Sequence, residues 1–226
     1  MKEARSHRAR VWDLPTRLFH WCLALLVVAA FVTINVGGNW VQWHFRCGYA
    51  ILALLLFRLI WGVVGGRHSR FASFVVGPRA VLSYLREPAD VPHAPGHNPL
   101  GALSVLAILS ALTIQIVLGL FANDDIASEG PLAVLVSKET SDLLTSAHHA
   151  WKVAVIALIA LHVSAIVFYR VARKRNLVAP MIAGDADSPV PFEPSRDDAG
   201  RRLLALVVLA ACALAVWLIV GGALTG

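Results

Sequence analysis

The sequence predicts an all-α integral membrane protein, a helical bundle with five transmembrane helices. Its 226 residues are 58% hydrophobic and only 15% charged, with a mean hydropathy of +0.67, which lies outside the range of soluble proteins. Apolar runs of about 20 residues recur along the chain, and that is the length needed to cross about 30 Å of hydrocarbon. Several histidines fall inside these runs, where an ionisable side chain is costly and needs a reason.

The five runs are expected to span the membrane at residues 17–36, 43–64, 98–121, 147–169 and 202–224. The first run is too long for the apolar part of a signal peptide, and we expect it to remain as a helix. Residues 71–86 mix apolar side chains with arginines, which favours a short helix in the membrane interface, begun by Pro78. Residues 87–96, 123–146 and 180–194 are expected to be loops or linkers.

The basic residues are unevenly distributed along the chain. Of the 20 Lys and Arg, five precede or begin the first run, four follow the second, and seven separate the fourth from the fifth. The two loops on the other side hold only Lys138, among five acidic residues. The positive-inside rule therefore predicts a cytoplasmic N-terminus and an external C-terminus. The net charge of +6 reflects this topology and does not indicate a nucleic-acid partner.

Four histidines form two pairs by their depth in the membrane. The first helix runs outward and the second runs inward, so His20 is expected near the cytoplasmic face and His44 near the external face. His148 opens the inward-running fourth helix. His162 follows 14 residues later, about 21 Å deeper. The outer pair is then His44 with His148, and the inner pair is His20 with His162.

Helical phase supports the same choice of residues. Fourteen residues at about 100° each return to within about 40° of the same face, so His148 and His162 face the same way. His149 is about 140° away from His162 and would face elsewhere. This favours His148 over His149 as a ligand, although a local kink would reverse the preference.

A pair of facing imidazoles at each of two levels is the ligand set that haem iron requires. The iron takes two axial ligands on opposite sides, and helical bundles supply them from facing helices. Zinc would need three or four ligands at one level. The three cysteines lie within apolar runs, and the chain lacks the C-x-x-C-H motif of covalently bound haem. We therefore expect a four-helix core with two haem b groups, and the alternative is that these histidines only hydrogen-bond between helices.

Three cations near the histidines are candidates for neutralising haem propionates. Arg58 follows His44 by 14 residues and so shares its face at the depth of the inner pair. Arg17 lies three residues before His20, at the same level. Lys152 lies one turn below His148, at the outer level. The alternative for each is that its charge extends along the helix surface to the membrane interface.

The chain also resembles the bacterial cytochrome b561 and nickel–iron hydrogenase b-type cytochrome family over about residues 10–184. The resemblance rests on the histidine spacing and on residues 11–21 (VWDLPTRLFHW), 57–62 (FRLIWG), 96–102 (GHNPLGA) and 130–133 (GPLA). It implies a di-haem transmembrane cytochrome of the bacterial cytoplasmic membrane that passes electrons between a periplasmic partner and the quinone pool. The ligands that it implies are His20, His44, His148 and His162. The fifth helix is more similar to the hydrogenase-type members.

We therefore expect a di-haem four-helix membrane domain at residues 1–184, followed by a linker and a fifth helix at 185–226. The acidic outer loop is either a plain solvated loop or a docking site for a basic redox protein such as a c-type cytochrome, and quinone would bind near the inner haem. A second hypothesis is a haem-bearing anchor subunit of a hydrogenase or other dehydrogenase complex, and the sequence leaves open whether the chain is an enzyme. A metal-ion transporter is a third hypothesis, disfavoured because the spans lack Asp and Glu.

Overall fold

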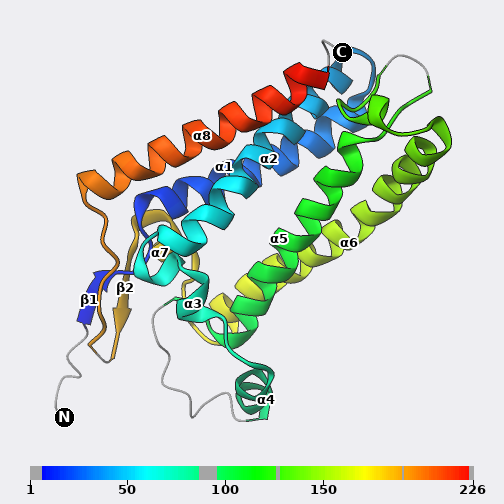
Figure 1. Cartoon of the computed structure of the whole chain (residues 1–226). Coiled ribbons are helices and arrows are strands. Elements are labelled where there is room, and N and C mark those ends of the chain that lie inside the picture. Colours follow the sequence, from blue (N-terminus) through cyan, green and yellow to red (C-terminus); the bar gives the residue numbers. More distant parts are fainter. Residues whose placement is uncertain (1–6, 87–95, 126–127, 190, 224–226) are drawn as a thin grey trace, which may run out of the picture. The chain divides into compact units, whose positions relative to one another are not determined.

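The computed structural model describes residues 7–86, 96–125, 128–189 and 191–223. In chain order (Figure 1) its elements are β1 (His7–Arg10), α1 (Leu14–Val36), η1 (Gly38–Trp40), α2 (Val41–Val64), η2 (Arg67–Ser69), α3 (Phe71–Phe74), α4 (Pro78–Arg86), α5 (Pro99–Leu120), η3 (Ala133–Leu135), α6 (Lys138–Val171), α7 (Val178–Ala183), β2 (Asp185–Ser188) and α8 (Ala199–Ala223). The predicted helical fold class is confirmed, because α1, α2, α5, α6 and α8 are each long and apolar enough to cross a membrane.

Helix α6 begins at Lys138, nine residues before the predicted start of the fourth span. The prediction of a loop at 123–146 is therefore wrong for its last nine residues. Ser137 caps this helix, because its hydroxyl accepts a hydrogen bond from the Thr140 amide at 3.3 Å and Glu139 occupies the first turn. Hydrophobicity marks only the part of a helix inside the bilayer, so it missed these polar turns.

Two other segments also differ from their predictions. The interfacial segment 71–86 forms two helices, α3 and α4, in place of one, and Pro78 begins the second as predicted. The predicted linker 180–194 contains the end of α7 and the strand β2, which pairs antiparallel with β1. Residues 87–95 of the predicted proline-rich loop lie outside the described residues.

The chain divides into two compact units. Unit 1 comprises Met1–Leu18, Leu59–Ala107 and Leu161–Ala205, and unit 2 comprises Phe19–Arg58, Ile108–Ala160 and Leu206–Gly226. In unit 2, a buried cluster joins three helices: Leu52 and Ala53 of α2, Leu120 of α5 and Val216 of α8. The fifth spanning helix therefore packs directly against α2 and α5.

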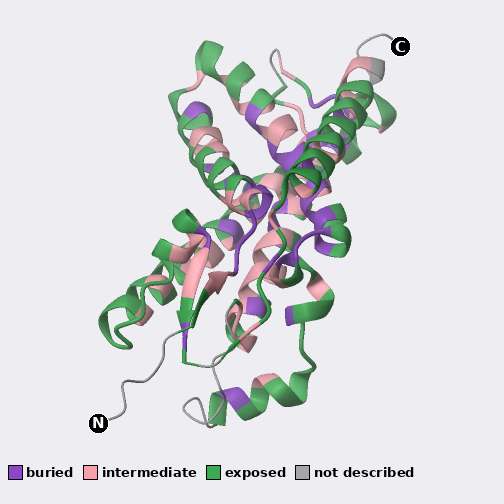
Figure 2. Cartoon of the chain, turned by 90° about the vertical axis from the view of Figure 1, so that its left-hand side faces the viewer, coloured by how far each residue is buried: buried purple, intermediate pink, exposed green. Residues whose placement is uncertain are grey.

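The long helices expose much of their apolar surface (Figure 2). In α6, Val153 and Leu161 are 65% and 66% exposed, and Leu206 of α8 is 64% exposed. Soluble proteins rarely expose contiguous apolar surface of this extent, whereas lipid tails cover it at no cost in a bilayer. The burial pattern therefore agrees with a multi-pass membrane protein.

A fully buried carboxylate organises unit 1 at the start of α1. Asp13 is 0% exposed and accepts hydrogen bonds from the Thr16 amide at 2.8 Å, the Gly66 amide at 3.0 Å, the Ser69 hydroxyl at 3.0 Å and the Trp61 indole N–H at 3.3 Å. The first of these bonds caps α1. A Cβ at position 66 would lie 2.2 Å from the Asp13 Oδ2 atom, so only glycine allows this approach. Asp13 thus joins the start of α1 to the end of α2.

A second polar cluster in unit 1 connects β1 with the segment before α8. Arg10 forms ion pairs with Asp185 at 2.6 Å and with Asp197 at 2.7 Å. Burial alone would raise the pKa of Asp197, but the hydrogen bond from Arg202 and the charge of Arg10 hold it below its ordinary value. A carboxylate with a lowered pKa stabilises the fold above its unfolded pKa, and this stabilisation is lost as the pH falls through the folded pKa.

We expect Asp13→Ala to lower the free energy of unfolding by about 3 kcal/mol or more, because four donors would lose their shared acceptor and all four are buried with it. Detergent-solubilised protein would show this as a lower apparent melting temperature by circular dichroism. Asp187→Ala, which removes an exposed carboxylate from β2, is the matched control. Equal melting temperatures for the two variants would contradict this role of Asp13.

Candidate functional site

The structure brings His44 of α2 and His148 of α6 together in unit 2. Their ring centroids are 6.3 Å apart and the ring planes are 85° to one another. Imidazole nitrogens bind transition metals at about 2 Å, so two imidazoles on opposite sides of one metal ion have centroids roughly 6 Å apart. The spacing of the two rings therefore fits a single metal ion between them.

Each ring is held through its Nδ1 atom by a backbone carbonyl of a neighbouring helix. The Nδ1 atom of His44 lies 2.9 Å from the carbonyl oxygen of Ala30 in α1. The Nδ1 atom of His148 lies 2.9 Å from the carbonyl oxygen of Gln115 in α5. An Nδ1–H bond to a carbonyl fixes the tautomer and leaves Nε2 as the metal ligand. Both rings are thus prepared to bind a metal through Nε2.

A cavity of about 500 Å³ adjoins the two imidazoles, a volume typical of cofactor sites. Most of its lining is apolar and comes from α1, α2, α5 and α6, while Asn35, His149 and Lys152 add polar groups. The expected cation Lys152 therefore lies at the same cavity as the outer pair. An apolar cavity with a few polar groups suits a flat amphiphilic group such as haem.

Two glycines, Gly48 and Gly119, line this cavity from α2 and α5. A Cβ at position 119 would lie only 2.9 Å from the Cε1 atom of His148, so a larger residue would displace the ring. A Cβ at position 48 would meet nothing closer than the Ile116 side chain at 4.0 Å. The glycines therefore leave room for the imidazole and for a planar ring system close to the backbone.

His149 lies closer to the site than helical phase alone suggested. Its ring centroid is 6.1 Å from that of His148, and it lines the same cavity. The structure nevertheless pairs His44 with His148, at the spacing of two axial ligands. His149 lies at the edge of the site, where an imidazole can hydrogen-bond a polar substituent of a bound group.

The four residues expected around the inner haem fall in different units. His20 and Arg58 belong to unit 2, whereas Arg17 and His162 belong to unit 1, so their grouping stays a prediction. Arg58 is only 3% exposed within α2, where an unneutralised charge would be costly.

The guanidinium of Arg17 already has a partner within unit 1. Its Nη1 atom donates to the carbonyl oxygen of Ile182 at 2.5 Å, and its Nη2 atom lies 4.0 Å from the carboxylate of Asp197. Arg17 is thus held by the segment that follows α6.

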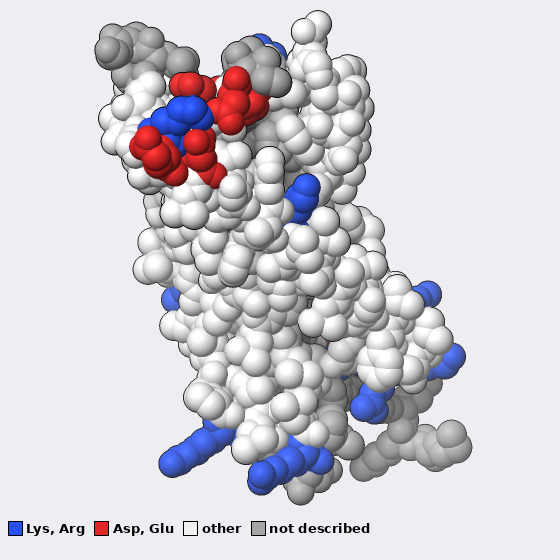
Figure 3. Space-filling model, turned by 90° about the vertical axis from the view of Figure 1, so that its right-hand side faces the viewer, with Lys and Arg blue, Asp and Glu red and all other residues white. Residues whose placement is uncertain are grey.

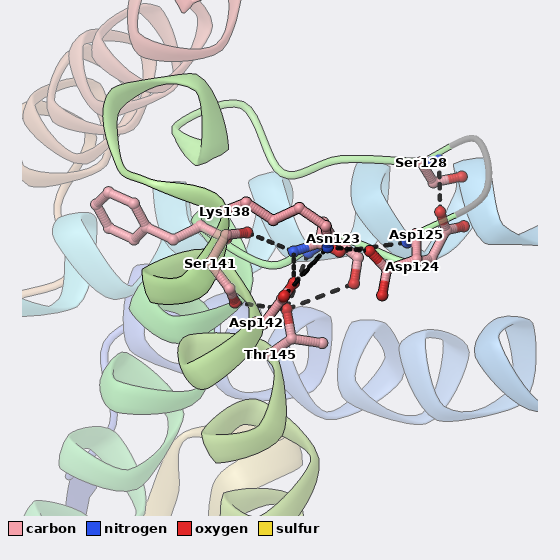
Figure 4. A network of polar contacts seen from close by, with 9 residues as sticks. Asn123, Asp124, Asp125, Ser128, Lys138, Ser141, Asp142 and Thr145 are labelled. Carbon is pink, nitrogen blue, oxygen red and sulfur yellow. Dashed lines mark hydrogen bonds and ion pairs between the residues drawn. The ribbon is translucent and has the colours of Figure 1, made fainter.

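The segment after α5 is fixed to the beginning of α6 by a polar network (Figure 4). The Asn123 amide donates to the Ser141 hydroxyl at 2.6 Å and to the Asp142 carboxylate at 2.9 Å. Lys138 pairs with Asp125 and also with Asp142, at 3.0 Å. Figure 3 shows a group of acidic side chains gathered around a basic one on this face of the molecule. The acidic side chains of the predicted outer loop therefore lie close together, but Lys138 neutralises part of their charge.

The sequence did not indicate two contributors to the site, Gln115 and Gly119. Gln115 is the only side-chain amide in the apolar helix α5, and a polar residue of this kind inside a span is a usable signal. Gly119 gave no signal, because glycine is common in transmembrane helices.

The ligand set favours haem over a zinc-type site. Among the described residues, no group of three or more His, Cys, Asp or Glu side chains converges. Haem iron needs only two protein ligands because the porphyrin supplies the others. The facing imidazoles, the apolar cavity and the glycines therefore fit haem.

The comparison with known proteins agrees with this chemistry. The profile of the family described as "Prokaryotic cytochrome b561" matches residues 11–184. Three similar proteins are each described as a "Probable Ni/Fe-hydrogenase B-type cytochrome subunit". Those of Bradyrhizobium diazoefficiens and Rhodobacter capsulatus are both 23% identical, over 77% of this chain and 84% and 79% of their own lengths. That of Cupriavidus necator is 25% identical, over 77% of this chain and 85% of its own.

No solved structure matches the chain. The family profile alone covers well over half of the sequence, and the five spans and the histidine site agree with it. The chain therefore belongs to the prokaryotic cytochrome b561 family, whose b-type cytochromes are haem-bearing membrane proteins of electron transfer.

Proposed function

We propose that this chain conducts electrons across the bacterial cytoplasmic membrane through two b-type haems, between the quinone pool and a periplasmic redox partner. Family membership implies haem b and membrane electron transfer. The observation that carries the proposal is the His44–His148 pair, with centroids 6.3 Å apart and with both Nδ1 atoms engaged by backbone carbonyls.

The outer haem would be held by His44 and His148, with Lys152 near its propionates. When bound, the haem supplies a one-electron couple. His44 and His148 would hold the iron from both sides, and this would leave no position for oxygen to bind. The apolar lining excludes water, and the protein's part is to hold the rings and set their electronic environment. This arrangement favours electron transfer over catalysis at the iron.

The inner haem would be held by His20 and His162, with Arg58 as the main candidate to neutralise a propionate. The support is the depth and phase of these residues in the sequence, together with the single helix α6 that carries both His148 and His162. Quinone would bind near this inner haem, where electrons enter or leave the membrane phase.

The distribution of charge supports an orientation in the membrane. The segments of unit 1 carry 16 of the 20 Lys and Arg, and those of unit 2 carry four. By the positive-inside rule, the loops that carry most of these residues would lie on the cytoplasmic side with the N-terminus. With five spans, the C-terminus would then lie in the periplasm, on the side proposed for the outer haem.

Two partners fit the periplasmic side. A basic c-type cytochrome would be attracted by the acidic residues around Lys138. Alternatively, the chain is the membrane anchor of a hydrogenase or another dehydrogenase complex, which the names of the three similar proteins favour. In either case the electrons would pass through His44 and His148.

We expect the purified chain to contain two non-covalent haems, and His148→Ala to contain one, because the outer iron would lose an axial ligand. The pyridine haemochrome assay measures this ratio. The matched control is His149→Ala, which removes the neighbouring imidazole and should retain both haems. The opposite result for these two variants would assign the ligand to His149, and two haems in both variants would exclude this outer pair.

We expect Gly119→Val to weaken binding of the outer haem by roughly 10–100-fold, because the added side chain would displace the His148 ring. Haem content after size-exclusion chromatography measures the loss. Gly221→Val is the control, since a Cβ at position 221 would meet no atom within 4 Å. Full haem content in the Gly119 variant would show that the ring does not need this space.

We expect a quinol to reduce both haems in proteoliposomes, followed by reduction of an added basic c-type cytochrome. In His44→Ala this last step should be lost, because the outer haem is missing. Docking through acidic residues also predicts that the rate falls as ionic strength rises. Absorbance at the haem and cytochrome bands follows each step.

The anchor hypothesis gives a different result in the same system. The haems would not respond to quinol in the purified chain, and a catalytic subunit would co-purify with it in stoichiometric amount from native membranes.

A further inference from the structure

Gln115 is a polar side chain in the apolar helix α5, and it lines the cavity beside the outer pair. Thr113, the neighbouring polar residue, bonds within its own helix, to the Leu109 carbonyl at 2.8 Å. The Gln115 amide reaches across to α6, where its Nε2 atom donates to the His148 carbonyl oxygen at 3.1 Å. The Gln115 amide therefore binds the residue whose imidazole is the proposed ligand.

The same amide nitrogen lies against the imidazole itself. It is 3.2 Å from the Nδ1 atom and 3.2 Å from the Nε2 atom of His148. An atom that lay in the ring plane at 3.2 Å from both nitrogens would overlap a ring carbon. The amide therefore lies over the face of the imidazole, with its N–H group directed at the π system. The ring edge at Nε2 stays available for a metal.

Helix α5 restrains this imidazole in two further places. The Gln115 carbonyl accepts the Nδ1–H bond at 2.9 Å, and the backbone at Gly119, one turn along, lies against Cε1. The ring can then rotate neither about its own bond nor away from α5 without breaking a contact. Among the described residues, His44 has one hydrogen-bond partner, the carbonyl of Ala30. The two ligands are therefore held unequally.

The Gln115 Oε1 atom is buried and has no hydrogen-bond partner among the described residues. A buried acceptor without a partner costs free energy, about 1–3 kcal/mol. An apolar side chain at this position would avoid that cost, so the amide needs another explanation. Holding and polarising the His148 ring is a role that an apolar residue cannot perform.

We propose that Gln115 is a positioning residue that fixes the orientation of the His148 imidazole and thereby sets the reduction potential of the outer haem. This inference rests on the proposed di-haem function. The positive end of the amide dipole lies beside an axial ligand, so it disfavours the ferric state, which carries one more positive charge than the ferrous state. Its removal should therefore lower the potential of this haem and leave the inner haem unchanged.

The test compares Gln115→Leu with wild-type protein in a potentiometric titration of the haem absorbance. Leucine nearly conserves the side-chain volume and removes the N–H donor. We expect one of the two titration phases to shift toward the oxidised state by about tenfold in the equilibrium constant, or about 59 mV for one electron. The second phase serves as an internal reference and should not move. Gln42→Leu, the same substitution at an exposed position of α2, is the matched control.

Electron paramagnetic resonance of the ferric protein provides a second readout. Ligand planes at 85° predict a highly anisotropic low-spin signal for the outer haem. Gln115→Leu should decrease this anisotropy, because the ring then loses one of its restraints and can tilt from its present plane. Gln115→Glu keeps the shape and replaces the N–H donor by an oxygen, and a carboxylate there would favour the ferric state further, so its shift should have the same sign as that of the leucine variant.

The outcomes separate this inference from the function on which it rests. Fewer than two haems in the wild-type protein would overturn the di-haem function itself. Two haems with an unchanged potential and an unchanged resonance signal in Gln115→Leu would overturn the role of Gln115. Equal shifts of both phases, or a rise in potential, would also overturn it, because the effect would then be global or of the wrong sign.

Discussion

A helix inside a bilayer has few spare hydrogen-bond acceptors, because each carbonyl is already bonded within its own helix. The outer site depends on two backbone carbonyls that accept a second hydrogen bond. A carbonyl oxygen has two lone pairs, and those of Ala30 and Gln115 accept a further bond from an imidazole, each at 2.9 Å. The bonds hold each ring against a neighbouring helix and leave Nε2 for a metal. The orientation of the two rings toward one another depends on these two bonds.

In unit 1 the buried polar group is the side chain of Asp13, and its partners are of another kind. The Asp13 carboxyl group has no exposed surface, and four donors from two backbone amides and two side chains surround it. The donors come from both sides of the α2 terminus, so this side chain acts as a cross-link. At the outer site the polar groups that meet are instead imidazoles and backbone carbonyls.

Most of what the sequence could predict came from the regular spacing of residues along helices. The five spans and the approach of His44 to His148 follow from local spacing, which a regular helix converts directly into depth and facing. The donors around Asp13 and the contact between Gln115 and His148 join residues far apart in the chain, and no periodic pattern encodes them. The start of α6 was also missed, because polar helical turns resemble a loop in hydropathy. The pairing of His20 with His162 stays a prediction, since these residues belong to different units.

The length of α6 has a consequence for any protein that exchanges electrons with this chain. Its 34 residues extend for about 51 Å, whereas the hydrocarbon of a bilayer is about 30 Å thick. In a helix that runs along the membrane normal, about 21 Å would therefore lie outside the hydrocarbon. Ten residues, or about 15 Å, separate its beginning at Lys138 from His148, the proposed outer ligand. A redox partner that contacts only the first turn of α6 would stay at about that distance, whereas one that contacts the side of the helix would meet Asp124 and Thr145, which line the cavity. The length of α6 would thus favour redox partners whose shape lets them reach past its first turns.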